Sequence, residues 1–350
     1  DTSVTYSIIC GNYPGQLDGQ VSMSSYNSCA LTNCLDDDDD GVPDGCAGGD
    51  ADGILHVPTE YPTLRLAWEE VEDGNTIMIA AGEYGTDGAN EFRAEDMTIS
   101  IIGETNDDGT PAVIIDGEND SVQLYMAILG DGTGYATVEN IHFKRFGGGL
   151  GMGNCSGVIR NCIIEDGYAN MTGLYLLNFQ GTVESCRISD NNSNFFAAGI
   201  LIQDDPNNAP SNISLIDCVV ENNYAAFILG GGWGGVTYGD GNGTVDLIGC
   251  TITANSGADG GGLRAYAPWV TTLTDTAVCG NEIPEQILGD WVDNGGNCVQ
   301  VFCDDCDEAC PGDFDDSGTV NVSDLLAVIA GWDDPYNVND LLLVISEWGS

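Results

Sequence analysis

The segment "DFDDSGTVNVSD" at residues 313–324 carries oxygen-bearing side chains at the spacing of a calcium loop. Gly318 stands at loop position 6, where glycine permits a sharp turn, and Thr319 at position 7 offers its carbonyl. The side-chain ligands would be Asp313, Asp315, Ser317, Asn321 and Asp324. Because hard divalent cations prefer oxygen ligands, the sequence predicts one calcium site here.

A second acidic run, "DDDDDGVPDGC", occupies residues 36–46. Four carboxylates surround Gly41 at alternating and turn-related spacing: Asp36, Asp38, Asp40 and Asp44. A solvated acidic linker is the alternative interpretation, but ligands two residues apart that face a shared loop favour calcium. The run resembles a thrombospondin type 3 calcium repeat, and we predict a disulfide between its flanking cysteines, Cys34 and Cys46.

Side chains suited to catalysis on sugars are harder to identify. Glycoside hydrolysis uses two carboxyl groups on either side of the bond, and Asp204 with Asp205 in "ILIQDDPNN" is the best pair. Arg187 lies near the repeat stretches and is a candidate base, although ion pairing with one of the abundant carboxylates is the simpler explanation. Three aromatic residues would either stack on sugar rings or pack against the fold: Tyr224, Trp233 and Tyr238.

Composition narrows the class of protein. The chain has 56 acidic and 7 basic residues, a formal net charge of -49, which disfavours nucleic acid and anionic membranes as partners. Fourteen cysteines with few lysines indicate an oxidising compartment. The start at Asp1 is consistent with a removed signal peptide, and no apolar run approaches the ~18 residues of a transmembrane helix. We expect a secreted, extracellular or cell-surface protein without a transmembrane segment.

The middle of the chain repeats a cysteine-centred stretch, as in "VIRNCIIEDG", "VESCRISDNN", "SLIDCVVENN" and "DLIGCTITAN". Aligning these stretches makes four cysteines equivalent: Cys162, Cys186, Cys218 and Cys250. Five residues after the last three of these cysteines stand Asn191, Asn223 and Asn255, and Asn281 follows Thr276, the equivalent position of the next copy, at the same spacing. If the repeats stack as coils about 4.8 Å apart, the cysteines become buried thiols and the asparagines a hydrogen-bonded ladder.

Ten cysteines remain outside this column, and most lie toward the two ends of the chain. Disulfides there would hold segments that bury little apolar surface. Cys279 with Cys298 is the predicted pair, because it closes the segment "CGNEIPEQILGDWVDNGGNC".

Four regions follow from these patterns: a Cys/Asp-rich segment at 1–53, repeated strands at 54–300, a Cys-rich joint at 301–312 and a calcium module at 313–350. "TLRLAWEEVE" after Tyr61-Pro62 predicts a helix that caps the strands. Residues 54–300 resemble right-handed parallel β-helix proteins of the pectate-lyase-like superfamily. Residues 313–350, with "VSDLLAVIAGW" and "VNDLLLVISEW", resemble a type I dockerin, as found in secreted bacterial proteins. The predicted fold class is all-β, a parallel β-helix solenoid with a capping helix and a small EF-hand-like helical module.

Two functions are compatible with this organisation. The favoured one is a calcium-stabilised structural, adhesive or fibre-forming protein that self-assembles as a homo-oligomer or filament, or attaches to a surface scaffold. The alternative is a polysaccharide lyase or glycoside hydrolase attached through the dockerin-like module, since the resemblance implies carbohydrate chemistry. The polygalacturonase "GHG" and "RIK" signatures are absent from the sequence, which favours the non-catalytic interpretation.

Overall fold

The computed structural model describes residues 53–303 apart from short gaps at 87–91, 118–124, 131, 170–172, 195–196, 227–232, 258–259, 266 and 283–285. Near the N-terminus it describes the backbone of four strands, β1 (Thr2–Val4), β2 (Ile8–Cys10), β3 (Val21–Met23) and β4 (Cys29–Leu31). Beyond residue 303 it describes helix α2 (Val322–Ala330) and residues 341, 344 and 345. The predicted calcium ligands at 36–44 and 313–321, the side chain of Asp324, and Cys34 and Cys46 lie outside the described residues.

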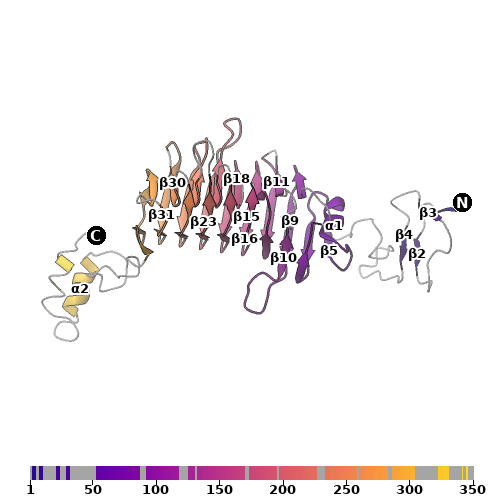
Figure 1. Ribbon diagram of the computed structural model, residues 1–350, viewed down its shortest axis with the longest axis horizontal. Coiled ribbons are helices and arrows are strands. Elements are labelled where there is room, and N and C mark those ends of the chain that lie inside the picture. Colours follow the sequence, from indigo (N-terminus) through magenta and orange to yellow (C-terminus); the bar gives the residue numbers. More distant parts are fainter. Residues whose placement is uncertain are drawn as a thin grey trace.

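Three long parallel sheets run side by side along the molecule (Figure 1). The ten-stranded sheet contains β5 (Ile54–Val57), β6 (Thr76–Ile79), β9 (Ile99–Gly103), β12 (Tyr135–Glu139), β15 (Ser156–Arg160), β19 (Gln180–Glu184), β23 (Asn212–Ile216), β27 (Thr244–Ile248), β31 (Val270–Thr274) and β34 (Val292–Asp293). The nine-stranded sheet contains β7 (Gly82–Tyr84), β10 (Val113–Asp116), β13 (Ile141–Lys144), β16 (Ile163–Glu165), β20 (Arg187–Ser189), β24 (Val219–Glu221), β28 (Thr251–Thr253), β32 (Ala277–Cys279) and β35 (Cys298–Gln300).

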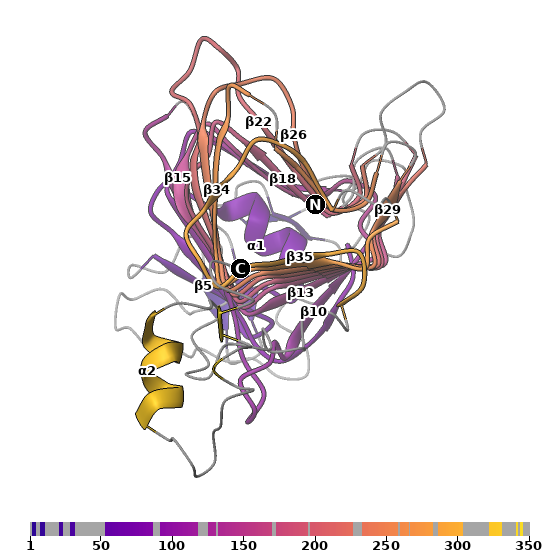
Figure 2. The same cartoon turned by 90° about the vertical axis from the view of Figure 1, so that its left-hand side faces the viewer.

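The eight-stranded sheet contains β8 (Phe92–Glu95), β11 (Tyr125–Leu129), β14 (Gly149–Gly153), β18 (Leu174–Leu177), β22 (Ile200–Gln203), β26 (Val236–Tyr238), β30 (Leu263–Ala265) and β33 (Ile287–Gly289). A short four-stranded sheet of β17 (Tyr168–Ala169), β21 (Asn192–Ser193), β25 (Tyr224–Ala225) and β29 (Ser256–Gly257) lies at the corner between the nine- and eight-stranded sheets. Each coil visits the sheets in the same order, so the predicted all-β solenoid is confirmed (Figure 2).

Alternating side chains explain why the sheets close around one core. In β15, Gly157 and Ile159 are buried while Ser156 and Arg160 face outward, and the same alternation recurs from coil to coil. One continuous hydrophobic cluster of mostly Ile, Val and Leu fills the interior from Leu55 to Val278. Stacking therefore buries the apolar row that no single coil can bury alone.

Short polar residues turn the corner between the ten- and nine-stranded sheets. On different coils this corner is occupied by a residue with a positive φ between 49° and 60°: Asn140, Asn161, Ser185, Asp217 and Asp275. Asparagine and aspartate tolerate this left-handed conformation better than most residues. The corner directs the following residue into the core. After Asn161, Ser185 and Asp217 that residue is an aligned cysteine, and Cys250 follows Gly249 at the same corner.

Helix α1 (Leu64–Glu70) closes the N-terminal end of the solenoid, as the sequence predicts (Figure 2). The Thr63 hydroxyl accepts a hydrogen bond from the Leu66 amide, which is the expected N-cap arrangement. Leu64 and Ala67 are fully buried in the solenoid core. The Trp68 ring packs edge-on against Phe92 at 5.5 Å, and its indole N–H donates to the Arg93 carbonyl. These contacts cover apolar surface that the first coil would otherwise expose.

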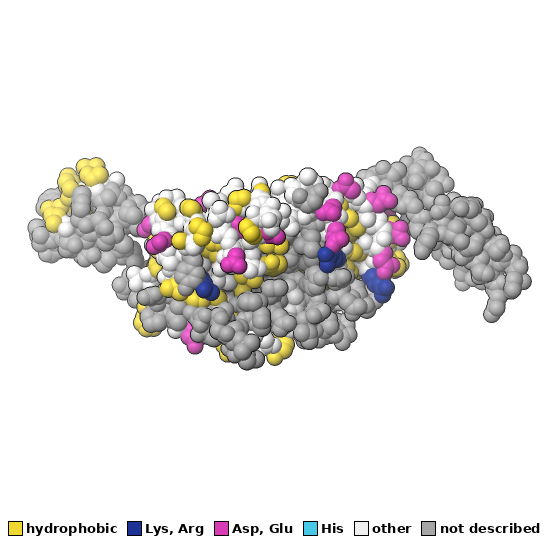
Figure 3. All heavy atoms as spheres, turned by 90° about the horizontal axis from the view of Figure 1, so that it is seen from above, with side chains coloured by type: hydrophobic (Ala, Val, Ile, Leu, Met, Phe, Trp, Pro, Cys, Tyr) yellow, Lys and Arg dark blue, Asp and Glu magenta, His cyan; other side chains and the backbone are white. Residues whose placement is uncertain are grey.

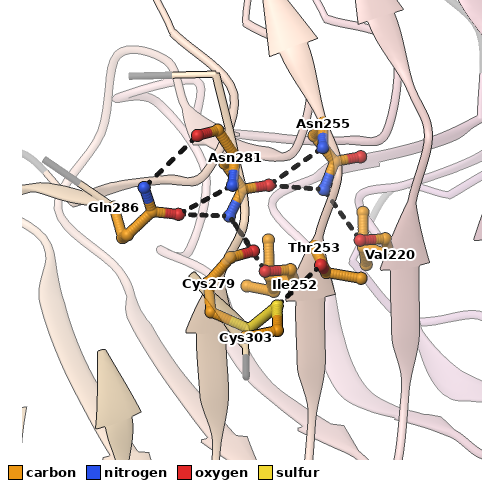
Figure 4. The surroundings of a disulfide bond; sticks show 8 residues. All are labelled: Val220, Ile252, Thr253, Asn255, Cys279, Asn281, Gln286 and Cys303. Atoms are coloured by element: carbon orange, nitrogen blue, oxygen red, sulfur yellow. Dashed lines mark hydrogen bonds between the residues drawn. A yellow bond between two sulfur atoms is a disulfide. The ribbon is translucent and has the colours of Figure 1, made fainter. Parts of the chain in front are cut away.

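The C-terminal end is held by a disulfide between Cys279 and Cys303, so the predicted Cys279–Cys298 pair is wrong (Figure 4). β35 pairs with β32 in a register that places Cys298 beside Ala277 and Gln300 beside Cys279. The chain then continues to Cys303, whose Cα lies 5.0 Å from that of Cys279, within disulfide range. Cys298 also forms a disulfide, but not with Cys279.

Beyond the solenoid, α2 packs Val328 and Leu325 against Val344 and Leu341. Its other side exposes the apolar side chains of Val322, Leu326 and Ile329. Figure 3 shows hydrophobic side chains at the end of the molecule that carries α2, while acidic side chains gather over the coils nearest the N-terminus. Within the described residues, no helix has both the length and the apolarity needed to cross a membrane.

Candidate functional site

The aligned cysteines form a column inside the solenoid. All four side chains are at most 2 % exposed and carry free thiols: Cys162, Cys186, Cys218 and Cys250. Each thiol donates to a carbonyl of the preceding coil, as Cys218 does to Val183 at 3.3 Å. Hydrogen bonding to the Cys186 sulfur together with burial raises the pKa of Cys218 to about 12. The Cys218 thiol therefore remains protonated near neutral pH. Because all four thiols are buried, the column serves packing rather than nucleophilic chemistry.

The four aligned asparagines form a continuous ladder one corner further along the chain. In the middle rung, the Asn223 amide nitrogen donates to Asn255 Oδ1 at 3.0 Å and to the Ile188 carbonyl at 2.9 Å. Its Oδ1 accepts from the backbone and side-chain nitrogens of Asn191. Gln286 ends the ladder by accepting from Asn281 (Figure 4). Every rung is buried, so the ladder fixes the corner that carries the four-stranded sheet.

Asp204 and Asp205 do not form a catalytic pair. Asp204 is 5 % exposed; its Oδ1 accepts from the amide and hydroxyl of Ser211, and its Oδ2 accepts from the Asn242 amide. Asp205 accepts from the backbone and side chain of Asn207 in a local turn. Both carboxylates therefore brace the loop between β22 and β23.

Arg187 lies away from these acids because β20 and β22 belong to different sheets of the same coil. Its guanidinium makes a 2.5 Å ion pair with Glu221 on the next coil. A neighbouring pair of the same geometry joins His142 Nε2 to Glu165 at 2.8 Å. The sequence-predicted catalytic set is thus not brought together, and Arg187 is an element of cross-strand pairing.

The three candidate aromatic residues divide between core and surface. Trp233 is fully buried, and its indole N–H donates to the Gly262 carbonyl at 2.7 Å. Tyr238 is 4 % exposed because β26 places it in register with the core residue Ile202. Tyr224 is 46 % exposed on the four-stranded sheet and is therefore the member of this group that can meet a ligand ring.

A hollow of about 380 Å³ lies on the outer side of β22, β26 and β30. Leu201, Thr237 and Arg264 share one outward-facing register on these strands and form its floor. Its wall is the Trp269 ring, which packs on Tyr238 with centroids 5.2 Å apart. The volume falls within the range of ~300–1,000 Å³ that is typical of small-ligand sites.

Polar side chains enter this hollow from rigid elements. The guanidinium of Arg264 lies 5.8 Å from the centre of the Trp233 ring, a cation–π contact that orients it. Gln203 Oε1 accepts the Tyr175 hydroxyl at 3.0 Å, which leaves its amide N–H groups to donate elsewhere. The carboxylate of Asp240 is exposed at the rim. Two donor groups, one acceptor and an aromatic wall suit a polyhydroxylated ligand.

Glycine makes the rim of the hollow possible. Gly241 has φ +139°, and a Cβ there would lie 2.6 Å from the Asp204 Cβ and 2.7 Å from the Trp269 ring. The Trp269 indole N–H also donates to the Gly239 carbonyl at 3.1 Å. The loop therefore wraps closely around Trp269 only because its backbone carries no side chain at this point.

The sequence patterns do not identify Gln203, Asp240 or Trp269 as binding residues, and Arg264 is only one of seven basic residues that could serve. The spacing of "YGDGNG" and "APW" gave a partial signal, since alternating glycines indicate close backbone approach. Within the described residues, no group of three or more His, Cys, Asp or Glu side chains is placed to hold a metal ion. The hollow is accordingly a candidate binding site formed by donors, a carboxylate and an aromatic ring.

Of the comparisons with known proteins, the family model agrees with the architecture. A family model described as "Right handed beta helix region" matches residues 99–281. A pectin methylesterase from Aspergillus niger is 12% identical over 72% of this chain and 87% of its own, with a TM-score of 0.37. Pectate lyase Pel9A is 12% identical over 73% of this chain and 74% of its own, with a TM-score of 0.40. A search of curated proteins gave no match.

Proposed function

This chain belongs to the right-handed β-helix family, and from that premise we propose that it is an extracellular adhesive solenoid that binds carbohydrate without cleaving it. The observation that carries the proposal is the hollow over β22, β26 and β30. There the Arg264 guanidinium, the Gln203 amide and the Asp240 carboxylate surround one space walled by the Trp269 ring. Guanidinium and amide donors with a carboxylate acceptor match the hydroxyl groups of a sugar.

Binding without turnover is supported by how the candidate catalytic groups are used. Both oxygens of Asp204 accept hydrogen bonds from neighbouring loops, Oδ1 from Ser211 and Oδ2 from the Asn242 amide, and Arg187 is paired with Glu221. A general acid must instead be free to exchange a proton with the leaving group. The favoured role is therefore attachment, with the polysaccharide lyase or hydrolase kept as the competing proposal.

We also propose that the protein is secreted, that calcium occupies the loops at 36–44 and 313–324, and that its ends mediate self-assembly or attachment to a scaffold. The net charge of -49 favours bound cations, which relieve repulsion between carboxylates. The exposed apolar side chains of α2, Val322, Leu326 and Ile329, support assembly through the C-terminal module.

Calorimetric titration of the protein with a panel of neutral and acidic oligosaccharides tests the hollow. We expect Asp240→Ala to weaken binding about tenfold, because it removes a charge-assisted hydrogen bond. Asp107→Ala, which changes an exposed aspartate elsewhere, is the matched control and should leave the affinity unchanged. Equal affinity of both variants would exclude this site. Release of new reducing ends or of unsaturated uronates from any substrate would favour the enzyme instead.

A further inference from the structure

The four-stranded corner sheet carries a row of outward side chains that the hollow does not involve. The row consists of the first residue of each strand, and these residues are paired in register: Tyr168 on β17, Asn192 on β21, Tyr224 on β25 and Ser256 on β29. Tyr168 is 59 % exposed and Tyr224 is 46 % exposed. The two rings are separated by one intervening strand, so they stand about 9–10 Å apart along the solenoid axis.

The buried asparagine ladder holds this row in place. Asn192 directly follows the ladder residue Asn191, and Tyr224 directly follows Asn223. The backbone amide of Asn192 donates to the Gly167 carbonyl at 2.8 Å, and that of Tyr224 donates to the Asn191 carbonyl at 2.8 Å. Tyr168 directly follows Gly167, whose backbone amide donates to Asn191 Oδ1 at 3.0 Å. Both tyrosines are therefore attached to residues that hydrogen-bond to the ladder, which fixes the spacing of the two rings.

Acidic and amide groups flank the tyrosine row. Asp166 and Asp190 stand two residues before Tyr168 and Asn192, at the preceding left-handed corner, and both are exposed. Asn222 occupies the same corner position before Tyr224. Carboxylates and amides accept hydrogen bonds from hydroxyl groups, but the carboxylates repel a ligand of negative charge.

We propose that this row is a binding platform for an extended, neutral, β-linked polysaccharide that lies along the solenoid axis. One pyranose ring of such a chain is about as long as one strand spacing, so alternate rings would lie over Tyr168 and Tyr224. Aromatic faces pack against the apolar faces of sugar rings, while Asn192 and the flanking aspartates meet the hydroxyl groups. The local carboxylates and the net charge of -49 select a neutral glycan over a polyuronate.

The test is affinity electrophoresis of the full chain in gels that contain a soluble neutral β-1,4-glucan or polygalacturonate. We expect retardation in the glucan gel and none in the polygalacturonate gel. Tyr168→Ala and Tyr224→Ala should each weaken glucan affinity about five- to tenfold, and the double variant should abolish retardation. Tyr224→Phe keeps the ring and should retain binding.

Tyr135→Ala is the matched control, because Tyr135 is 48 % exposed on β12 of the ten-stranded sheet. Its glucan affinity should equal that of the unsubstituted protein. The proposal is overturned if the unsubstituted protein binds no neutral glucan, if polygalacturonate binds equally well, or if the double tyrosine variant is retarded normally. A loss in Tyr135→Ala equal to that in Tyr224→Ala would also overturn it. Because the hollow is also proposed to bind sugars, the tyrosine variants are compared in the Asp240→Ala background, where binding by the hollow is weakened, so that the two sites are distinguished.

Discussion

The substitution Asn223→Ala removes the central rung of the buried ladder. Four side-chain hydrogen bonds are lost: two accepted from Asn191 and two donated to Asn255 and Ile188. Asn223 is fully buried and Asn191 is 1 % exposed, so water does not replace the missing partner. The Asn191 backbone N–H and the Ile188 carbonyl each lose a partner in the core.

An unsatisfied buried donor or acceptor costs about 1–3 kcal/mol, so two such groups imply a loss of about 4 kcal/mol in the free energy of unfolding. Asn212→Ala is the matched control on the neighbouring strand β23. The Asn212 side chain is exposed and accepts one hydrogen bond from Thr244, which water can replace. Its expected cost is within about 0.5 kcal/mol.

Urea denaturation followed by far-ultraviolet circular dichroism measures both variants against the unsubstituted chain. We expect a much lower urea midpoint for Asn223→Ala and an almost unchanged midpoint for Asn212→Ala. A difference of less than about 1 kcal/mol between the two variants would refute it, because exposed and buried asparagines would then be equivalent.

Further predictions concern the ends, the thiols and the hollow. Cys303→Ser opens a disulfide that joins positions 24 residues apart, which should lower the free energy of unfolding by about 3–4 kcal/mol in urea titrations; equal stability with and without reductant would contradict this. Since the pKa of Cys218 is raised from 9.0 to about 12, stability should fall as pH rises from 9 toward 12, and Cys218→Ala should flatten that slope. Gly241→Ala should destabilise the rim by about 1–3 kcal/mol and abolish sugar binding in calorimetry, whereas retained binding would argue against close packing on Trp269. Chelation of calcium should lower the helical dichroism if the loop at 313–324 holds the ion, and an unchanged spectrum in titrations would count against that site.

The interior of the solenoid follows from the sequence because its rows repeat. The alignment of Cys162 with Cys186 and of Asn191 with Asn223 matches the observed strand registers, since each coil must present the same side chain to the same place in the core. Because each core position accepts the same residue type on every coil, the repeat can be recognised in the sequence even though the number of residues per coil varies.

The surface and the ends could not be derived in the same way. Cys298 and Cys303 both follow Cys279 at plausible distances, and only the register of β35 on β32 decides which one reaches it. The hollow depends on how the loops around Trp269 fold back, which no period encodes. Trp233 lies in an irregular segment, where the sequence does not show whether a ring faces inward.

The stacking of coils at a fixed spacing sets the distance between the two ends of the solenoid. Every coil contributes one strand spacing, about 4.8 Å, to the distance between helix α1 and the C-terminal disulfide. The cysteine-centred unit repeats after 32 residues between Cys186, Cys218 and Cys250, so inserting one more 32-residue unit would preserve both internal columns. The spacing between whatever the two ends hold would then change in fixed steps, while the interior chemistry stayed the same.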